Sequence, residues 1–398
     1  MRIILYAGKG GVGKTSVAAA TGIVSAQKGL KSLVMSLDPA HSLSDAFDLD
    51  ATLMDKNKGM PQKVAGNLWI QELDVHQEIA DNWGEINHFI AGLINQTGID
   101  DVLAEEMAVL PGMEELSALL HINRYAQNEE FDLVILDCAP TAESLHFVSL
   151  PKTLDWYMRK VFRIQRRVAM LIRPVAKLMT DLPVPDDEHF ETMQNIFERI
   201  DGADQLLTDP QITSVRLVTN LEKMVLRETQ RAFMVFGLHR LSIDAIIVNR
   251  VLPAEPGDSH LSAWQELQRG YLDLAESYFS PVPILQAPFY QTEVLGYDRL
   301  EKLGRRLFAD LKPEDILYLH KPFEFVRQNG RQFLRLHLPF AAKEEIDLNR
   351  VGDELIIRLG NFKKAIILPR AFALLEPKKA QFQGEDLVVD FGGDHGQE

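Results

Sequence analysis

The chain has 398 residues, of which 46% are hydrophobic and 25% charged, and it carries a formal net charge of -15. This composition is typical of a globular protein with room for two or three domains, and its acidity argues against wholesale nucleic-acid binding. A single cysteine, Cys138, excludes an intrachain disulfide or a paired-cysteine metal clip and favours a reducing compartment. Because we find no targeting segment and no apolar run of the roughly 18–20 residues that span a bilayer, we expect a soluble, cytoplasmic protein.

Four short apolar runs in the first 250 residues have the character of buried strands. They are residues 3–8 (IILYAG), 32–38 (SLVMSLD), 132–137 (DLVILD) and 245–252 (AIIVNRVL). Each is apolar on both faces, as are strands of a parallel sheet that helices cover. Residues 14–29, after the first run, have the composition of a helix. The pattern predicts an α/β fold with a doubly wound, mostly parallel sheet.

The rest of the chain divides by texture. Long stretches of helical composition, roughly 76–128 and 151–235, exceed simple crossovers and predict a helical insertion. From about residue 330, short alternating runs separated by turn residues are typical of a small antiparallel β-sandwich. The predicted organisation is an α/β domain over 1–320, a linker over 321–329, a sandwich over 330–393 and a tail over 394–398.

The segment GKGGVGKTS, which begins at Gly8, fits two phosphate-binding patterns. Gly8, Gly10 and Gly13 match the dinucleotide fingerprint G-x-G-x-x-G. Gly8, Gly13, Lys14 and Thr15 match the P-loop G-x-x-x-x-G-K-[ST] of nucleotide triphosphatases. The lysine and hydroxyl suit a β- or γ-phosphate and Mg²⁺, whereas a dinucleotide site needs neither.

Two aspartates bear on the choice between these patterns. Asp137 follows four apolar residues, the Walker B arrangement that holds Mg²⁺ through water. Asp38 ends the second run, where a dinucleotide-binding fold keeps its ribose-binding acid, but Pro39 follows it. Two carboxylates would repel a pyrophosphate unless a divalent metal lay between them. The sequence therefore predicts an ATPase that uses ATP and Mg²⁺, with a dehydrogenase as a remote alternative.

Lys9 is a residue that an ordinary P-loop does not require. One interpretation is a solvated loop lysine. The other is a contact in trans with the phosphates of a second subunit, the role that an arginine finger plays elsewhere.

In combination, these motifs resemble the ArsA/GET family of ATPases. The phosphate loop is similar to the family's deviant Walker A motif, and residues 36–47 (SLDPAHSLSDAF) and 137–151 (DCAPTAESLHFVSLP) resemble its switch I and switch II. AIIVNRVLP and PVPILQAPFYQTEVLGYDRL resemble its adenine-binding segments. The C-terminal segment, with GDELIIRLG, is similar to the α-crystallin-like module of a branch found in photosynthetic organisms.

The resemblance implies roles for individual residues. The catalytic residues would be Lys9, acting across a homodimer, Lys14 at the β- and γ-phosphates, and Asp38, which would orient the attacking water. Mg²⁺ would be held by the Thr15 hydroxyl and, through water, by Asp137. The other nucleotide-binding residues would be the rest of the phosphate loop and three residues near the adenine: Gly8, Gly10, Gly11, Val12, Gly13, Ser16, Asn249, Pro288 and Phe289.

The chain also departs from the family pattern. Cys138 stands where a threonine is usual, and Ala142-Glu143 replaces a glycine-histidine pair. Without a second cysteine, neither the arsenite site of the pump ATPases nor the zinc clip of the eukaryotic targeting ATPase can be built. An arsenite-pump role is therefore not expected, and a homodimer would depend on packing and nucleotide.

Residues 156–179 carry seven basic residues, no acid and one apolar helical face. The segment is either a helix packed on its own domain, a wall for an apolar client helix, or a contact with an anionic membrane surface. The predicted function is an ATPase switch that captures and releases a hydrophobic client such as a membrane-protein helix. The alternatives are a chaperone-like binding protein that acts without turnover and a MinD-like organiser at a membrane surface.

Overall fold

The computed structural model divides into two compact units. The first comprises Met1–Ile3, Thr15–Leu207 and Val294–Gly304, and the second comprises Ile4–Lys14, Thr208–Glu293 and Arg305–Glu398. The structure describes residues 1–38, 42–49, 59–78, 112–158, 162, 187–253, 259–341, 346–360 and 362–393.

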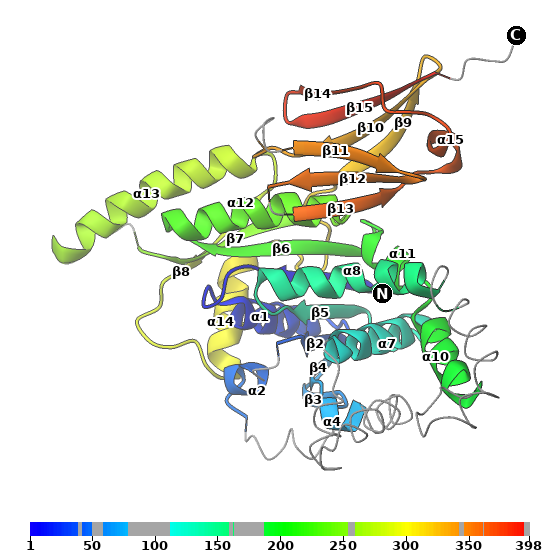
Figure 1. Ribbon diagram of the computed structural model, residues 1–398. Coiled ribbons are helices and arrows are strands. Elements are labelled where there is room, and N and C mark those ends of the chain that lie inside the picture. Colours follow the sequence, from blue (N-terminus) through cyan, green and yellow to red (C-terminus); the bar gives the residue numbers. More distant parts are fainter. Residues whose placement is uncertain are drawn as a thin grey trace, which may run out of the picture. The chain divides into compact units, whose positions relative to one another are not determined.

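The largest sheet has eight strands among the described residues, in the order β3-β4-β2-β5-β1-β6-β7-β8 (Figure 1). Strand β2 pairs in parallel with β4 and β5, and β7 pairs in parallel with β6 and β8, while β3 runs antiparallel to β4. The predicted α/β fold with a mostly parallel sheet is confirmed. The strands are β1 (Arg2–Ala7), β2 (Ser32–Ser36), β3 (Gln62–Ala65), β4 (Leu68–Glu72), β5 (Leu133–Asp137), β6 (Thr213–Asn220), β7 (Ile243–Val251) and β8 (Ile284–Pro288).

The first unit combines buried strands with helices. Strands β2 and β5 are buried along their whole length, as their apolar composition predicts. No helix among the described residues has the length and apolar character needed to cross a membrane. The helices are α1 (Lys14–Gln27), which begins at the last residue of the second unit's first segment, α2 (Ser42–Ala46), α4 (Val75–Glu78), α7 (Met113–Gln127), α8 (Thr141–Tyr157), α10 (Asp187–Ile200) and α11 (Ala203–Thr208).

A buried polar network joins α4 and α7 to strand β4. His121 Nε2 lies 2.7 Å from Glu78 Oε1, and the Tyr125 hydroxyl donates to Gln71 Oε1 at 3.0 Å. Burial raises the pKa of Tyr125 to about 12. Since each of these side chains finds a partner inside the protein, the network fixes both helices to β4, the strand next to the edge strand β3.

The second unit contains helices α12 (Lys223–Leu238) and α13 (Ser259–Phe279) and an antiparallel β domain. Helix α14 (Tyr297–Phe308) belongs to both units by its residues. The β domain has a four-stranded sheet, β14-β15-β10-β9, and a three-stranded sheet, β11-β12-β13, among the described residues (Figure 1). Its elements are β9 (Phe323–Gln328), β10 (Arg331–His337), β11 (Ile346–Val351), β12 (Glu354–Leu359), β13 (Phe362–Ile367), α15 (Arg370–Ala373), β14 (Lys379–Gln383) and β15 (Asp386–Gly393).

Helix α12 shares the hydrophobic core of this β domain. Met234 and Leu238 of α12 belong to the same buried cluster as Leu334, Leu355 and Val389 of the two small sheets. The helix also packs against β6. One helix therefore contributes to the large sheet's cover and to the core of the β domain.

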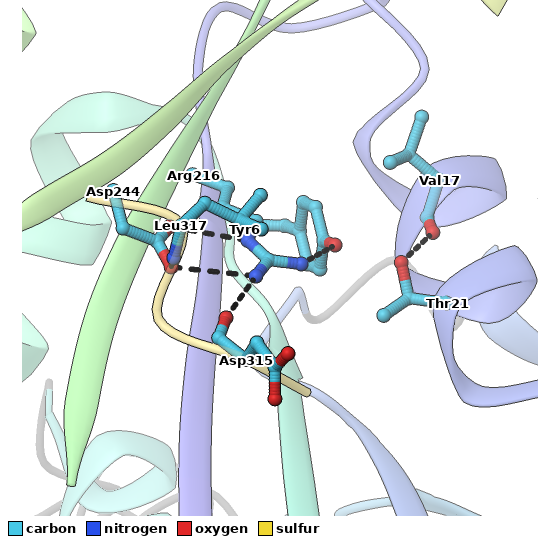
Figure 2. Close-up of polar contacts among 7 residues, drawn as sticks. All are labelled: Tyr6, Val17, Thr21, Arg216, Asp244, Asp315 and Leu317. Carbon is cyan, nitrogen blue, oxygen red and sulfur yellow. Dashed lines mark hydrogen bonds and ion pairs between the residues drawn. The ribbon is translucent and has the colours of Figure 1, made fainter. Parts of the chain in front are cut away.

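A fully buried ion pair crosses from β6 to β7. Arg216 Nε donates to Asp244 Oδ1 at 3.1 Å, and the other guanidinium nitrogens donate to the Tyr6 hydroxyl at 3.3 Å and the Asp315 carbonyl at 3.1 Å (Figure 2). Burial opposes the charge of Arg216, but Tyr6 and Asp244 outweigh it and raise its pKa. Leu317 N also donates to Asp244, so the segment after α14 is fastened to the ends of both strands.

Two predicted boundaries are wrong. Residues 213–220 form β6 and do not belong to a helical stretch over 151–235. Arg216 interrupts the apolar run TSVRLVTN, and its burial is tolerable because Asp244, the Tyr6 hydroxyl and the Asp315 carbonyl accept hydrogen bonds from its guanidinium. Residues 323–328 form β9 of the sandwich, so they are not part of a linker over 321–329. Residues 79–111 of the predicted helical stretch over 76–128, residues 159–161 and 163–186 of the stretch over 151–235, which include most of the basic segment 156–179, and the tail 394–398 lie outside the described residues.

Candidate nucleotide-binding site

The phosphate loop between β1 and α1 depends on glycine at two close approaches. Gly8 and Gly13 have φ angles of 151° and 93°, which residues with a side chain rarely adopt. A Cβ on Gly8 would lie 2.3 Å from the carbonyl oxygen of Val218, and one on Gly13 would lie 2.3 Å from Asn249 Nδ2. By contrast, a Cβ on Gly10 or Gly11 would meet nothing within 4 Å. The loop is therefore in close contact with β6 at Gly8 and with β7 at Gly13, whereas the space around Gly10 and Gly11 is open.

Asn249, near the end of β7, holds this loop. Its Nδ2 donates to the carbonyl oxygen of Val12 at 2.8 Å, and its Oδ1 accepts a hydrogen bond from Arg250 N at 2.9 Å. The sequence resemblance implied that this side chain binds the adenine edge, and that role stays a prediction. An amide keeps one further donor hydrogen and one further acceptor position, so the loop contact leaves room for it.

The two lysines of the loop differ in exposure. Lys14 is buried, with 7% of its surface exposed, and its Nζ lies 3.4 Å from the Lys9 carbonyl oxygen. The Lys9 side chain is only partly covered. A buried ammonium beneath a glycine loop whose middle is open suits a phosphate ligand, because the anion would supply the opposite charge.

The two predicted aspartates lie at the carboxyl ends of neighbouring strands of the first unit: Asp137 ends β5, and Asp38 comes two residues after the end of β2. Asp137 is the last residue of β5, is 1% exposed and pairs with Ser36 of β2. Its carbonyl oxygen accepts a hydrogen bond from Leu37 N at 2.8 Å, and Asp38 N donates to Ser36 Oγ at 3.2 Å. Two carboxylates thus stand at the carboxyl ends of adjacent parallel strands, the edge at which open α/β sheets bind ligands.

Thr15 and the switch I segment meet in the same unit. The Thr15 hydroxyl lies 3.2 Å from that of Ser42, the first residue of α2. Glu72, the last residue of β4, accepts hydrogen bonds from Leu43 N at 2.9 Å and Ser44 N at 3.0 Å. A carboxylate therefore caps the first turn of α2 and satisfies amide groups that the helix itself leaves open. Residues 39–41 of switch I lie outside the described residues.

Pro288 is the last residue of β8, in the second unit, and Phe289 follows it. Pro288 ends β8 opposite Val251 of β7, and Phe289 N donates to the Val251 carbonyl at 2.8 Å. The ring of Phe289 is 51% exposed. An exposed ring at a strand end is available to stack on a base, and its contact with adenine stays a prediction.

Cys138 is fully buried, and its Sγ lies 3.7 Å from the Leu136 carbonyl. It is therefore a small core residue with no access to solvent. The side chains of Thr141 to Glu143, in the switch II segment, lie outside the described ones.

Sequence reasoning missed two polar residues at strand ends. Glu72 ends LWIQE as Asp137 ends LVILD, so a search for acids after short apolar runs could have found it. Asn220 ends β6 and pairs with Asn249 in register. Its strand falls within the helical stretch that the sequence predicts over 151–235, so no sequence signal marks Asn220 as a strand end.

The residues present fit a nucleotide triphosphate. The open glycines and the buried lysine suit phosphate groups, and Thr15 is the second residue of the helix that follows them. Without an anionic ligand, the buried ammonium would have only the Lys9 carbonyl oxygen, 3.4 Å away, as a partner among the described residues.

Comparisons with known proteins agree with this reading. The family of anion-transporting ATPases, ArsA_ATPase, matches residues 1–309, and the HSP20-like domain found in ArsA matches residues 329–391. A protein of Aquifex aeolicus (strain VF5), provisionally named arsenical pump-driving ATPase 1, is 44% identical over 393 residues, which are 98% of this chain and 99% of that protein. One of Chlorobaculum tepidum, provisionally named arsenical pump-driving ATPase, is 36% identical over 394 residues, 98% of this chain and 96% of its own.

A further relative is the ATPase GET3 of Candida glabrata, which is 31% identical over 334 residues, 78% of this chain and 90% of its own. The two family matches divide the chain where the α/β sheet gives way to the antiparallel β domain. The chain belongs to the ArsA ATPase family and is an ATP hydrolase with the HSP20-like domain found in that family.

Proposed function

We propose that this ATPase is a homodimeric, Mg²⁺-dependent switch that couples ATP binding and hydrolysis to the capture and release of a hydrophobic client, such as a membrane-protein helix. The observation that carries the proposal is the family match over residues 1–309 together with a phosphate loop whose second residue is Lys9. An ordinary P-loop does not require that lysine. In a homodimer, it could contact the phosphates of a nucleotide bound to the partner subunit.

In this proposal the site residues act on MgATP. Lys14 binds the β- and γ-phosphates, the Thr15 hydroxyl and a water on Asp137 hold Mg²⁺, and Asp38 orients the attacking water. Lys9 of the partner subunit offsets the charge that develops as the γ-phosphate leaves. Bound Mg²⁺ would supply neutralisation of the phosphate oxygens.

The pump activity in the names of two relatives is not part of the proposal. Arsenite binding by thiolates needs several cysteines, and this chain has only Cys138, whose side chain is 0% exposed. Neither the HSP20-like domain over 329–391 nor the exposed ring of Phe289 supplies a thiolate ligand for arsenite.

The proposal is tested with a 20-residue leucine-alanine helix fused to a soluble carrier as the client probe. We expect the ATP-bound wild-type protein to retain the probe and to release it on hydrolysis. Asp38→Asn is expected to bind ATP, to lose hydrolysis and to keep the probe bound. Failure of the wild-type dimer to retain the probe with or without ATP would overturn the client role, and wild-type protein that stays monomeric with MgATP would overturn the shared site.

A second candidate is a chaperone-like binding protein that handles its client without turnover. The HSP20-like domain favours it. In that case Asp38→Asn would lose hydrolysis yet take up and release the probe as the wild-type protein does. A membrane-surface role would instead show as binding of the full chain to anionic vesicles.

A further inference from the structure

Asn220 presents an unsatisfied acceptor beside the phosphate loop. Its Oδ1 is buried and has no hydrogen-bond partner among the residues that the structure describes. Leaving a buried carbonyl unpaired typically costs about 1–3 kcal/mol, so such groups are rare unless a ligand or water completes them. The position of this one, at the last residue of β6, calls for an explanation.

The fold directs this side chain toward the loop's face of the sheet. The hydroxyl of Thr219 accepts a hydrogen bond from Thr229 of α12 at 2.9 Å, so Thr219 faces α12. Successive residues of a strand point to opposite faces, and Asn220 therefore points away from α12. It pairs in register with Asn249, whose side chain binds Val12 of the phosphate loop, and register partners share a face.

The backbone around Asn220 is already committed. Its carbonyl oxygen accepts a hydrogen bond from Glu222 N at 2.8 Å, which makes a tight turn at the strand end. Two residues earlier in the strand, the Val218 carbonyl oxygen lies 2.3 Å from where a Cβ on Gly8 would be. The strand end is thus held in place, and the unsatisfied Oδ1 is carried on a fixed support.

The chemistry of ATP narrows what can satisfy this oxygen. Phosphate oxygens accept hydrogen bonds and cannot donate to a carbonyl. The donors of ATP are the exocyclic amine of adenine and the ribose hydroxyls. Asn249, to which the resemblance assigns the base, has one of the two acceptor positions of its Oδ1 occupied by Arg250 N.

We propose that Asn220 Oδ1 accepts a hydrogen bond from the nucleoside part of bound ATP and so contributes to nucleotide specificity. The inference rests on the proposed function, since it takes ATP as the ligand. Asn220 and Asn249 then divide the work: Asn249 holds the phosphate loop, and Asn220 supplies an acceptor for a nucleoside donor.

The test is isothermal titration of the full chain with ATP and analogues that each lack one donor. Purine riboside triphosphate lacks the amine, and 2′-deoxy- and 3′-deoxy-ATP each lack one hydroxyl. We expect wild-type protein to bind one of these about 5- to 100-fold more weakly than ATP, which is the effect of a buried acceptor left unpaired. The analogue affected identifies the donor.

The variant Asn220→Ala is expected to lose this discrimination, so that ATP and the weak analogue bind alike. Asn220→Leu, which fills the same volume, gives a second test if the alanine variant folds poorly. The matched control is Asn128→Ala, since Asn128 caps α7 and bonds Glu130; it should discriminate as wild type does.

Two results would overturn the inference. Wild-type protein could bind all three analogues as tightly as ATP, or Asn220→Ala could weaken inorganic tripolyphosphate as much as ATP, which would mark a purely structural role. Both leave the proposed ATPase switch intact. Absence of any ATP binding by wild-type protein would instead overturn the proposed function itself.

Discussion

The side chain of Asn249 donates a hydrogen bond to the carbonyl oxygen of Val12 at 2.8 Å, which joins the end of β7 to the phosphate loop. The two residues are 237 positions apart in the chain. The geometry of the loop therefore depends on a strand that the sequence motif does not contain.

We expect Asn249→Ala to weaken binding of inorganic tripolyphosphate as well as ATP. One hydrogen bond contributes about 0.5–1.5 kcal/mol, so the dissociation constants should rise roughly 2- to 13-fold. Titration calorimetry with both ligands makes the measurement. Unchanged tripolyphosphate affinity would contradict the loop-holding role, and a larger loss for ATP would measure the predicted base contact.

Gly13→Ala should damage the same contact from the other side. Residue 13 has a φ of 93°, and the added Cβ would lie 2.3 Å from Asn249 Nδ2. We expect at least about a fivefold loss of ATP affinity, since backbone strain alone costs of order 1–3 kcal/mol. In the Gly13→Ala background, Asn249→Ala should cost less than it does in wild type, because the two substitutions disrupt one contact. Additive effects in this double-mutant cycle would contradict the clash.

Some strands of the large sheet could be predicted from the sequence and one could not. The strand-loop-helix around Lys14 and the strand that ends at Asp137 were predictable because both motifs are local and the strands are uniformly apolar. Strand β6 was not, because Arg216 breaks its apolar run and its partner Asp244 lies 28 positions away. No local pattern contains that pairing.

The same limit applies to the site. Asn220 and Asn249 are both asparagines at or near strand ends, yet the resemblance to the ArsA/GET family assigns a role only to Asn249. Their shared register arises from the pairing of β6 with β7, and the burial of Asn220 Oδ1 arises from tertiary packing. Likewise, nothing local in residues 323–328 distinguishes a strand from a linker, because β9 becomes part of a sheet only through its pairing with β10.

The buried pair Arg216–Asp244 gives a stability prediction. We expect Asp244→Ala to lower the free energy of unfolding by about 3–5 kcal/mol, since it leaves the guanidinium buried without its carboxylate. Replacing both residues, as Arg216→Met with Asp244→Leu, should cost less than Asp244→Ala alone, because no charge is then left unpaired. Urea denaturation monitored by circular dichroism measures both. A double variant less stable than the single one would contradict the account.

His320 gives a prediction for pH. Its ring lies 4.7 Å from that of His337, which bonds Asp386, and it stacks with the ring of Tyr318. Burial, and next the nearby His337, lower the pKa of His320 from its ordinary value of 6.5. Below about pH 6.5 the unfolded chain therefore binds a proton that the folded chain resists, so stability falls as the pH falls.

We expect His320→Gln to flatten the decline of the melting temperature between about pH 7.5 and pH 5, since the substituted side chain does not titrate. Differential scanning fluorimetry across this range is sufficient. Leu319→Gln is the matched control, because Leu319 is the preceding residue, is 52% exposed and cannot titrate. A wild-type decline in the His320→Gln variant would place the pH sensitivity elsewhere.

Leu238 links the ATPase match to the HSP20-like match. It lies on α12, within residues 1–309, yet it is 2% exposed inside the core cluster of the β domain. Leu238→Ala should lower the free energy of unfolding by about 2–5 kcal/mol, the usual cost of a cavity at a buried leucine. Because the residue belongs to both packing regions, α12 and the β domain should lose protection together in hydrogen exchange.

Met224→Ala, at a position 73% exposed on the same helix, should change stability by no more than about 0.5 kcal/mol. If Leu238→Ala instead loosened the β strands while α12 kept its full protection, the two would be separate folding units with a weak contact.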